Sequence, residues 1–134
     1  MARIGNKIVV DTYAWIEYFR GTIEGERAKK FIDGDFQLLT PSIVIAELSD
    51  KSTRGEMSDW DIKRRFISLK SGILPLDETT ADKAGKIKHW LRKKYKDVGI
   101  IDAIILTHSL IAEARLLTGD THLKSLENAI DISS

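Results

Sequence analysis

The chain alternates short runs of β-branched and aliphatic residues with longer segments of helical periodicity, and this alternation restricts the fold more than any other feature. The first run, Ile8-Val9-Val10, stops at Asp11, and aromatic residues at helical spacing follow it up to Gly21. Further short strands are predicted at 36–39, 72–76, 116–117 and 130–132. Strands that alternate with helices pair in parallel, and the connecting helices cover both faces of the sheet. We therefore expect an α/β fold, a three-layer α/β/α sandwich around a parallel sheet of four to five short strands.

Segments with the spacing of amphipathic helices separate the predicted strands. Beyond the first, they comprise 24–32, a helix that contains Glu47, 58–70, 78–95 and 100–114. Thr40-Pro41 resembles a helix start, because threonine can cap a helix and proline fits its first position. Ser58 and Asp61 have the spacing of a capping box. The segment 100–114 is apolar on almost all sides, which favours a place at the centre of the molecule.

The length of 134 residues suits one domain, so we expect a single domain over residues 1–134. With 43% hydrophobic and 31% charged residues, the composition is that of a packed fold and not of a disordered segment. The absence of cysteine excludes a disulfide, a thiolate zinc site and a cysteine nucleophile. No apolar run has the length of a signal peptide or a membrane span, so we expect a soluble, cytoplasmic protein without a membrane partner.

Four acidic residues stand where a parallel sheet would bring them together. Asp11 directly follows the first strand, and Asp120 follows the fourth through a Thr-Gly turn, at the strand ends where α/β proteins bind ligands. Glu47 and Asp102 lie in otherwise apolar segments, where a buried carboxylate needs a partner. The only basic residue within helical reach of either is Lys51. A divalent cation, Mg²⁺ or Mn²⁺, would satisfy all four carboxylates at once.

Each acid also has an ordinary structural explanation. Asp11 and Asp102 could cap helices or stabilise their first turns through the helix dipole. Glu47 could face solvent or pair with Lys51, and Asp120 could be a turn residue. The metal site is favoured because all four positions meet at one end of the predicted sheet.

The other residues that often carry chemistry form no recognisable site. His89, His108 and His122 lack the spacing of metal ligands, and we expect His108 to lie in the core with its hydrogen bonds satisfied. The tryptophans at 15, 60 and 90 fall on helical stripes and are predicted to be packing residues. The sequence has no phosphate-binding glycine loop and no nucleophile elbow. We therefore expect chemistry that needs no histidine.

Four segments resemble the PIN-domain nucleases, and in particular the VapC toxins. They are IVVDTYAWIEY at 8–18, PSIVIAE at 41–47, GIIDA at 99–103 and LTGDTH at 117–122. The resemblance runs from Ile8 to about Ile132, and four acids in this order and context carry it. It implies a PIN-like three-layer sandwich, a Mg²⁺- or Mn²⁺-dependent endoribonuclease activity on RNA, a homodimer, and inhibition by a small antitoxin protein.

The resemblance also assigns residues. The acidic quartet that holds one or two metal ions in this family corresponds to Asp11, Glu47, Asp102 and Asp120. Thr118 corresponds to the hydroxyl residue that braces the site, and Thr12 to the small polar residue after the first aspartate. Tyr13 departs from the family, which often has a small residue there, and this affects local packing.

A run of basic residues without any acid occupies 83–96, although the formal charge of the whole chain is only +1. At helical spacing Lys86, Lys93 and Lys96 lie opposite an apolar stripe. Together with Arg92 they are the predicted RNA-binding residues, because a polyanion held beside four carboxylates needs positive potential nearby. The alternative is a solvated helix face that only aids solubility.

Two other classes of α/β protein need different residues directly after the first strand. A phosphoacceptor receiver domain needs an adjacent acidic pair after the first strand, and a phosphatase with an Asp-x-Asp motif needs an acid at position 13. Thr12 and Tyr13 follow Asp11, which excludes both. Within the PIN family, two alternatives remain: an RNA-processing nuclease without an antitoxin, and a non-catalytic RNA-binding module. The complete quartet counts against the second.

Overall fold

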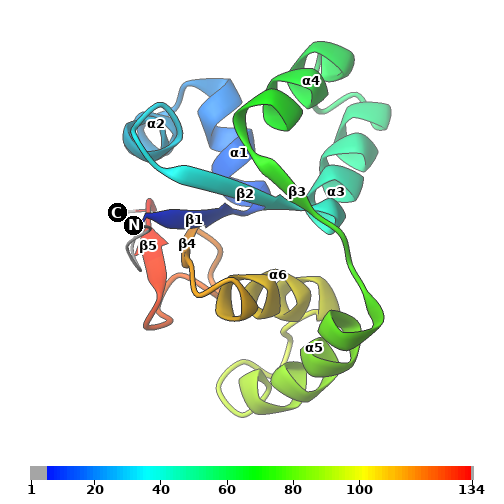
Figure 1. Ribbon diagram of the computed structural model, residues 1–134. Helices are drawn as coiled ribbons and strands as arrows, with labels where there is room; N and C mark the ends of the chain where they lie inside the picture. Colours follow the sequence, from blue (N-terminus) through cyan, green and yellow to red (C-terminus); the bar gives the residue numbers. More distant parts are fainter. Residues whose placement is uncertain (1–5, 134) are drawn as a thin grey trace.

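The computed structural model describes residues 6–133, which form a parallel sheet between two layers of helices (Figure 1). The strands are β1 (Lys7–Val10), β2 (Gln37–Pro41), β3 (Gly72–Leu74), β4 (Arg115–Thr118) and β5 (Ala129–Asp131). Their order is β3-β2-β1-β4-β5, and every neighbouring pair is parallel. The sheet confirms the predicted α/β class.

Helices cover both faces of the sheet, so the three-layer prediction is also confirmed (Figure 1). One layer holds α1 (Thr12–Arg20), α2 (Ile23–Ile32), α3 (Ser42–Thr53) and α4 (Trp60–Lys70), and the other holds α5 (Glu78–Leu91) and α6 (Ile100–Ile111). Helix α3 begins at the end of β2 and also contacts α6 across the edge of the sheet. Within residues 6–133, no helix has both the length and the apolar character to span a membrane.

The core forms where apolar residues of the central strands meet the helices on both faces. Ile8, Val9 and Val10 of β1 are completely buried, as a strand covered on both sides requires. Trp15 of α1 is buried too, and its indole N–H donates to Thr40 Oγ1 at 3.1 Å. A large apolar side chain with its one polar atom satisfied stabilises the α1 layer against β2.

The order of the strands places the carboxyl end of β1 beside that of β4. Val10 is paired with Leu117, and the Asp11 amide N–H donates to the Leu117 carbonyl at 3.2 Å. The chain crosses from β1 to β2 on one side and later returns to β4 on the other, so the sheet reverses its direction of winding at this point. Crevices at such reversals are where open α/β sheets bind ligands.

Two helices begin differently from the sequence predictions. The α3 helix starts at Ser42, and Pro41 remains extended as its N-cap, because the Thr40 hydroxyl is engaged by the core and does not cap. The N-cap of α4 is Asp59, whose φ of 55° is left-handed and whose side chain makes no capping bond. The predicted Ser58 capping box is therefore wrong.

The helix predicted at 78–95 ends at Leu91, because the residues after it bind another segment. The Tyr95 hydroxyl lies 2.8 Å from Ser125 Oγ, and Lys94 Nζ lies 3.3 Å from the same atom. These contacts hold the chain in tight turns. The α6 helix likewise ends at Ile111, three residues before the predicted end at Ala114.

Two predictions about packing need correction. Trp15 is buried and Trp60 is packed against the core, but Trp90 is 57% exposed and is not a packing residue. His108 is buried in α6 as expected, yet its Nε2 has no hydrogen-bond partner among the described residues. Its hydrogen bonds are therefore not all satisfied.

Candidate functional site

Asp11 stands at the carboxyl end of β1 and is only 2% exposed. Its Oδ1 accepts the Ala14 amide N–H at 2.8 Å, which caps α1. The Thr118 side chain, at the end of β4, is hydrogen-bonded to the same carboxyl group. Asp11 therefore caps α1, as the structural alternative to a metal site predicted. The cap uses only one oxygen of the carboxylate, which also lies at the end of the sheet.

The environment of Asp11 disfavours its charge. Burial raises the pKa of Asp11 to about 7, and the charges of Asp120 and Asp102 add to that increase. The hydrogen bonds from Thr118 and Ala14 act in the opposite direction but do not cancel it. A cation beside Asp11 would reverse this balance.

Asp120 is placed by a short turn after β4. The Thr118 hydroxyl accepts the Asp120 amide N–H at 3.0 Å, and Asp120 Oδ1 accepts the His122 amide N–H at 2.8 Å. Between them, Gly119 lies under the Tyr13 ring, and a Cβ at Gly119 would lie 2.2 Å from a ring carbon. A side chain at position 119 would therefore force the Tyr13 ring to move, so the glycine leaves room for the large residue after Thr12.

Glu47 reaches the site from α3. The Thr12 hydroxyl donates to Glu47 Oε1 at 2.5 Å, so the first turn of α1 holds this carboxylate. The ion pair of Lys51 is a long one with Glu56, at 3.9 Å, and the described residues include none between Lys51 and Glu47. The predicted alternative, in which Glu47 is explained by pairing with Lys51, is not supported.

Asp102, in the first turn of α6, contacts His122. Its Oδ2 lies 3.2 Å from His122 Nδ1, while His122 Nε2 lies 3.1 Å from Asp97 Oδ1. His122 Nδ1 is also 3.6 Å from Asp120 Oδ1. Burial raises the pKa of Asp102, and the charges of Asp120 and Glu47 raise it further against the opposing effect of His122.

The acidic surroundings also act on His122. Partial burial by itself lowers the pKa of the imidazole, but the hydrogen bond to Asp97 and the charges of Asp97, Asp120 and Asp102 raise it overall. One ligand atom each from Asp102, Asp120 and His122 lie within 4.8 Å of one another, a separation that a single metal ion could bridge.

The sequence analysis missed His122, because it tested histidines only for spacing to one another. The signal was the turn LTGDTH, in which an aspartate binds the amide of the second residue after it. That turn carries the histidine to the same place as the acid.

The four predicted acids line one cavity of about 250 Å³, together with Thr12 and Lys51; the lining residues are Asp11, Thr12, Tyr13, Ile16, Glu47, Lys51, Asp102, Ile105 and Asp120. Thr118 is fully buried and does not line the cavity, but its side chain is hydrogen-bonded to the carboxyl group of Asp11. Lys51 is the one cationic side chain in this lining. The structure thus brings together all six residues that the sequence analysis assigned to catalysis.

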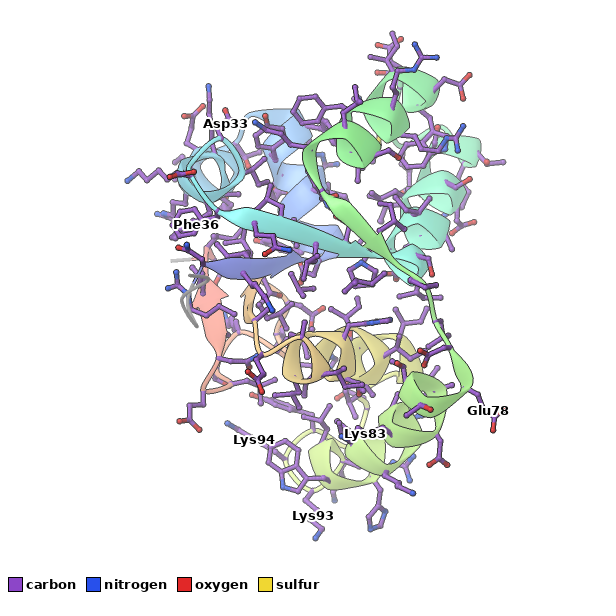
Figure 2. All side chains as sticks on the ribbon, in the orientation of Figure 1. Asp33, Phe36, Glu78, Lys83, Lys93 and Lys94 are labelled. Carbon is purple, nitrogen blue, oxygen red and sulfur yellow. The ribbon has the colours of Figure 1, made fainter. Side chains whose placement is uncertain are left out.

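The four predicted RNA-binding residues do not line this cavity. Lys86, Arg92, Lys93 and Lys96 are exposed along the second half of α5 and the turn after it. Figure 2 shows Lys93 and Lys94 at the end of α5 that is remote from the sheet. The link to the site is Tyr95, whose ring makes an edge contact with the His122 ring at 5.4 Å between centroids.

Comparisons with known proteins agree with this geometry. A chain of a toxin–antitoxin complex from Klebsiella pneumoniae is similar at 20% identity and a TM-score of 0.72, with 93% of this chain and 97% of that chain covered. A chain of DNA-bound VapBC from Salmonella typhimurium gives 20% identity and a TM-score of 0.68, with coverage of 94% and 98%. A chain of VapBC-1 from nontypeable Haemophilus influenzae gives 22% identity and a TM-score of 0.66, with 96% of this chain and 99% of that chain covered. At these identities the likenesses show the fold.

A comparison with curated proteins gives no match. The family model of the PIN domain, however, matches residues 8–129, from β1 to the start of β5. This match contains all four acids that line the cavity. The chain belongs to the PIN-domain family.

Proposed function

We propose that this protein is a metal-dependent endoribonuclease of the VapC type, the toxin of a toxin–antitoxin pair. The observation that carries the proposal is the cavity lined by Asp11, Glu47, Asp102 and Asp120, in which burial and like charge raise the pKa of Asp11 and Asp102. Such a cluster of carboxylates is incomplete without a cation. The similar structures from toxin–antitoxin complexes support the toxin assignment and an antitoxin partner.

The donor set fits Mg²⁺ or Mn²⁺. Carboxylate oxygens suit both ions, and the imidazole of His122 is compatible with Mn²⁺. The proposed ligands are the four acids, and His122 holds Asp102 and Asp120 from the side. When bound there, the cation lowers the pKa of a coordinated water and stabilises the charge that develops on phosphate oxygens.

The chain's own side chains prepare the site for a phosphodiester. Thr12 orients Glu47, and Thr118 holds Asp11 and the backbone of Asp120. Lys51 is placed to neutralise a phosphate oxygen, because it lines the cavity and its ion pair with Glu56 is long, at 3.9 Å. The side chains of the protein thus bind the phosphodiester and orient the carboxylates.

The substrate surface and the partners complete the proposal. The RNA backbone binds outside the cavity to four exposed residues of α5 and the turn after it that have no acid between them in the sequence: Lys86, Arg92, Lys93 and Lys96. The protein functions as a homodimer that a small antitoxin inhibits, in the cytoplasm.

The test is cleavage of labelled single-stranded RNA with Mn²⁺, with Mg²⁺ and with a chelator. We expect cation-dependent endonucleolytic products from the wild type and none from Asp11→Asn or Asp102→Asn. Calorimetric titration of Mn²⁺ into the double variant should show no binding while the circular dichroism remains that of a folded protein. Asp35→Asn is the matched control, because Asp35 is an exposed acid on the loop before β2. Cleavage that survives the chelator, or Mn²⁺ binding that survives the double substitution, contradicts the proposal.

A further inference from the structure

Trp90 is a large aromatic side chain that the fold does not use. It is 57% exposed, whereas Trp15 is buried and Trp60 packs against the core. The α5 helix contacts α6 and places Ala84, Ile87 and Leu91 in the interior. An exposed indole offers a broad flat apolar face on which a planar ligand can stack.

The neighbours of Trp90 on the helix surface are cationic. Lys86 lies four residues before it, and Lys93 and Lys94 lie three and four residues after it, which are the positions adjacent to it on a helix. The turn remains helical enough for this, since the Lys93 amide N–H donates to the Trp90 carbonyl at 3.2 Å. Lys93 and Lys94 extend from the same end of α5 in Figure 2. Lys86 is paired with Asp82 at 3.0 Å, but no acid between Lys83 and Lys96 neutralises Lys93 or Lys94.

This aromatic and basic surface continues to the acidic cavity. Lys94 lies 5.4 Å from the centre of the Tyr95 ring, and the Tyr95 ring contacts that of His122. His122 in turn contacts Asp102, which lines the cavity. Trp90 is joined to Lys94 by a tight turn, in which the Lys93 amide N–H donates to the Trp90 carbonyl and the Lys94 amide N–H to that of Leu91. A single-stranded RNA segment of a few nucleotides can therefore contact both Trp90 and Lys94.

The chemistry of the surface selects one occupant. Lysines attract phosphates of any sequence, and an indole offers a face on which an unpaired base can stack. A single strand presents both groups, whereas the bases of a duplex are already stacked inside it. A second copy of the chain would bring the same positive charges to this face and be repelled.

We propose that Trp90 stacks against an unpaired base of the RNA substrate, with Lys86 and Lys93 beside the flanking phosphates. The proposal rests on the proposed nuclease function and adds that the substrate is single-stranded where it leaves the cavity. Trp90 contributes affinity and not chemistry, so its loss weakens binding and leaves the metal site intact.

The experiment follows tryptophan fluorescence during titration with a single-stranded RNA oligonucleotide, in a chelator so that the RNA stays whole. We expect quenching in the wild type and in Trp60→Phe, but little in Trp90→Phe, in which Trp15 is buried and Trp60 packs against the core. Trp90→Ala should bind the oligonucleotide roughly 5- to 150-fold more weakly, and Trp90→Phe should recover part of that loss. Leu69→Ala is the matched control, since Leu69 is an exposed apolar residue on α4, in the other layer.

The outcomes separate this proposal from the function on which it rests. Equal affinity of Trp90→Ala and wild type, or equal quenching by duplex RNA of the same sequence, overturns the stacking proposal while cleavage by the wild type sustains the nuclease. A change in the mass of the Trp90→Ala protein in solution without a change in RNA affinity would make this face a protein interface and also overturn it. A wild type that neither binds nor cleaves RNA overturns both. Mn²⁺ binding by Trp90→Ala should equal that of the wild type.

Discussion

Asp11 combines two requirements in one side chain, because it caps α1 and also presents a buried carboxylate to the cavity. An amide can accept the capping bond from Ala14 but carries no charge. We therefore predict that Asp11→Asn stabilises the metal-free protein. The pKa of Asp11 is about 7 in the fold and 3.8 for the free side chain, a difference that corresponds to about 4 kcal/mol at pH 8.

The sign of this effect depends on pH. Because the pKa is raised in the fold, the carboxyl group does not lower the free energy of unfolding below pH 3.8. Between pH 3.8 and pH 7 it lowers the free energy of unfolding more and more, and above pH 7 the loss is constant. Thermal melts in a chelator should therefore show a higher Tm for Asp11→Asn at pH 8 and a difference that shrinks as the pH falls from 7 to 4. A variant that is less stable than the wild type at every pH would assign Asp11 to the helix cap alone.

Among the described residues, Lys51 is the only basic side chain that lines the cavity. Because it is the one cation lining the cavity, Lys51→Met should lower kcat/KM for RNA cleavage by roughly ten- to a hundredfold, and Lys51→Arg should retain most of the activity. Mn²⁺ affinity should not decrease, since removing a positive charge favours a cation. Lys30→Met on α2 is the control, as Lys30 is exposed and remote from the cavity. Activity of Lys51→Met at the wild-type level would exclude a phosphate contact.

The residues of the site differ in how far the sequence predicts them. Asp11 and Asp120 follow from the rule that parallel strands end at one edge, and both line the cavity. The position of His122 depends on Asp97 and Asp102, which come from another part of the chain. The direction of Lys51 likewise depends on how α3 packs. Contacts of this kind arise only from tertiary structure.

At the scale of the element, α6 is the helix whose apolar sequence most clearly predicts burial, and His108 is its exception. Its Nε2 has no hydrogen-bond partner among the described residues, and burial lowers its pKa. Replacement by leucine should raise the free energy of unfolding by about 1–2 kcal/mol, because an unsatisfied polar atom is removed at similar volume. Chemical denaturation at pH 7.5 measures this change.

The same histidine makes stability depend on pH. With a lowered pKa in the fold, the unfolded chain binds more protons below pH 6.5, so the wild type loses stability as the pH falls through that value. The free energy of unfolding of His108→Leu should therefore exceed that of the wild type by more at pH 5 than at pH 7. RNA cleavage at neutral pH should be unchanged. A narrowing difference would mean that His108 is protonated and paired in the fold.

Helix positions were predictable but several of their ends were not. Periodicity locates α5 because Ala84 and Leu91 are buried and Ile87 packs against the core. The end of α5 is set instead by the contact of Tyr95 with Ser125, which lies 30 residues further along the chain. Local sequence rules describe a helix end only where local contacts decide it.

For the molecule as a whole, the sequence predicts a parallel sheet in three layers, but not which strands adjoin. The order β3-β2-β1-β4-β5 places β1 beside β4, and the cavity forms where these strands end. Had β4 lain at the far edge, Asp11 and Asp120 would share an edge but not a site. Strand order is decided by the packing of helices on both faces, which no single segment encodes.

The last prediction concerns the distribution of charge over the whole molecule. A chain of net charge +1 gains little attraction for RNA from its total charge, so the segregation of basic residues over 83–96 must supply it. We predict that Lys86→Glu with Lys93→Glu weakens RNA binding and cleavage and leaves Mn²⁺ binding intact. For single-stranded RNA, each lost phosphate contact should flatten the slope of log affinity against log salt by about 0.7.

Lys29→Glu with Lys30→Glu is the matched control, because both lysines are exposed on α2, in the opposite helix layer, and the substitutions change the net charge equally. If total charge governs binding, both double variants will lose affinity alike. If the basic surface of α5 governs RNA binding, only the α5 variant will lose affinity and show a flatter slope of log affinity against log salt. An α5 variant that cleaves RNA at the wild-type rate with an unchanged slope would place the RNA elsewhere. The next residues to change would then be Lys51, which lines the cavity, and Arg54, which lines a second pocket together with Glu47 and Lys51.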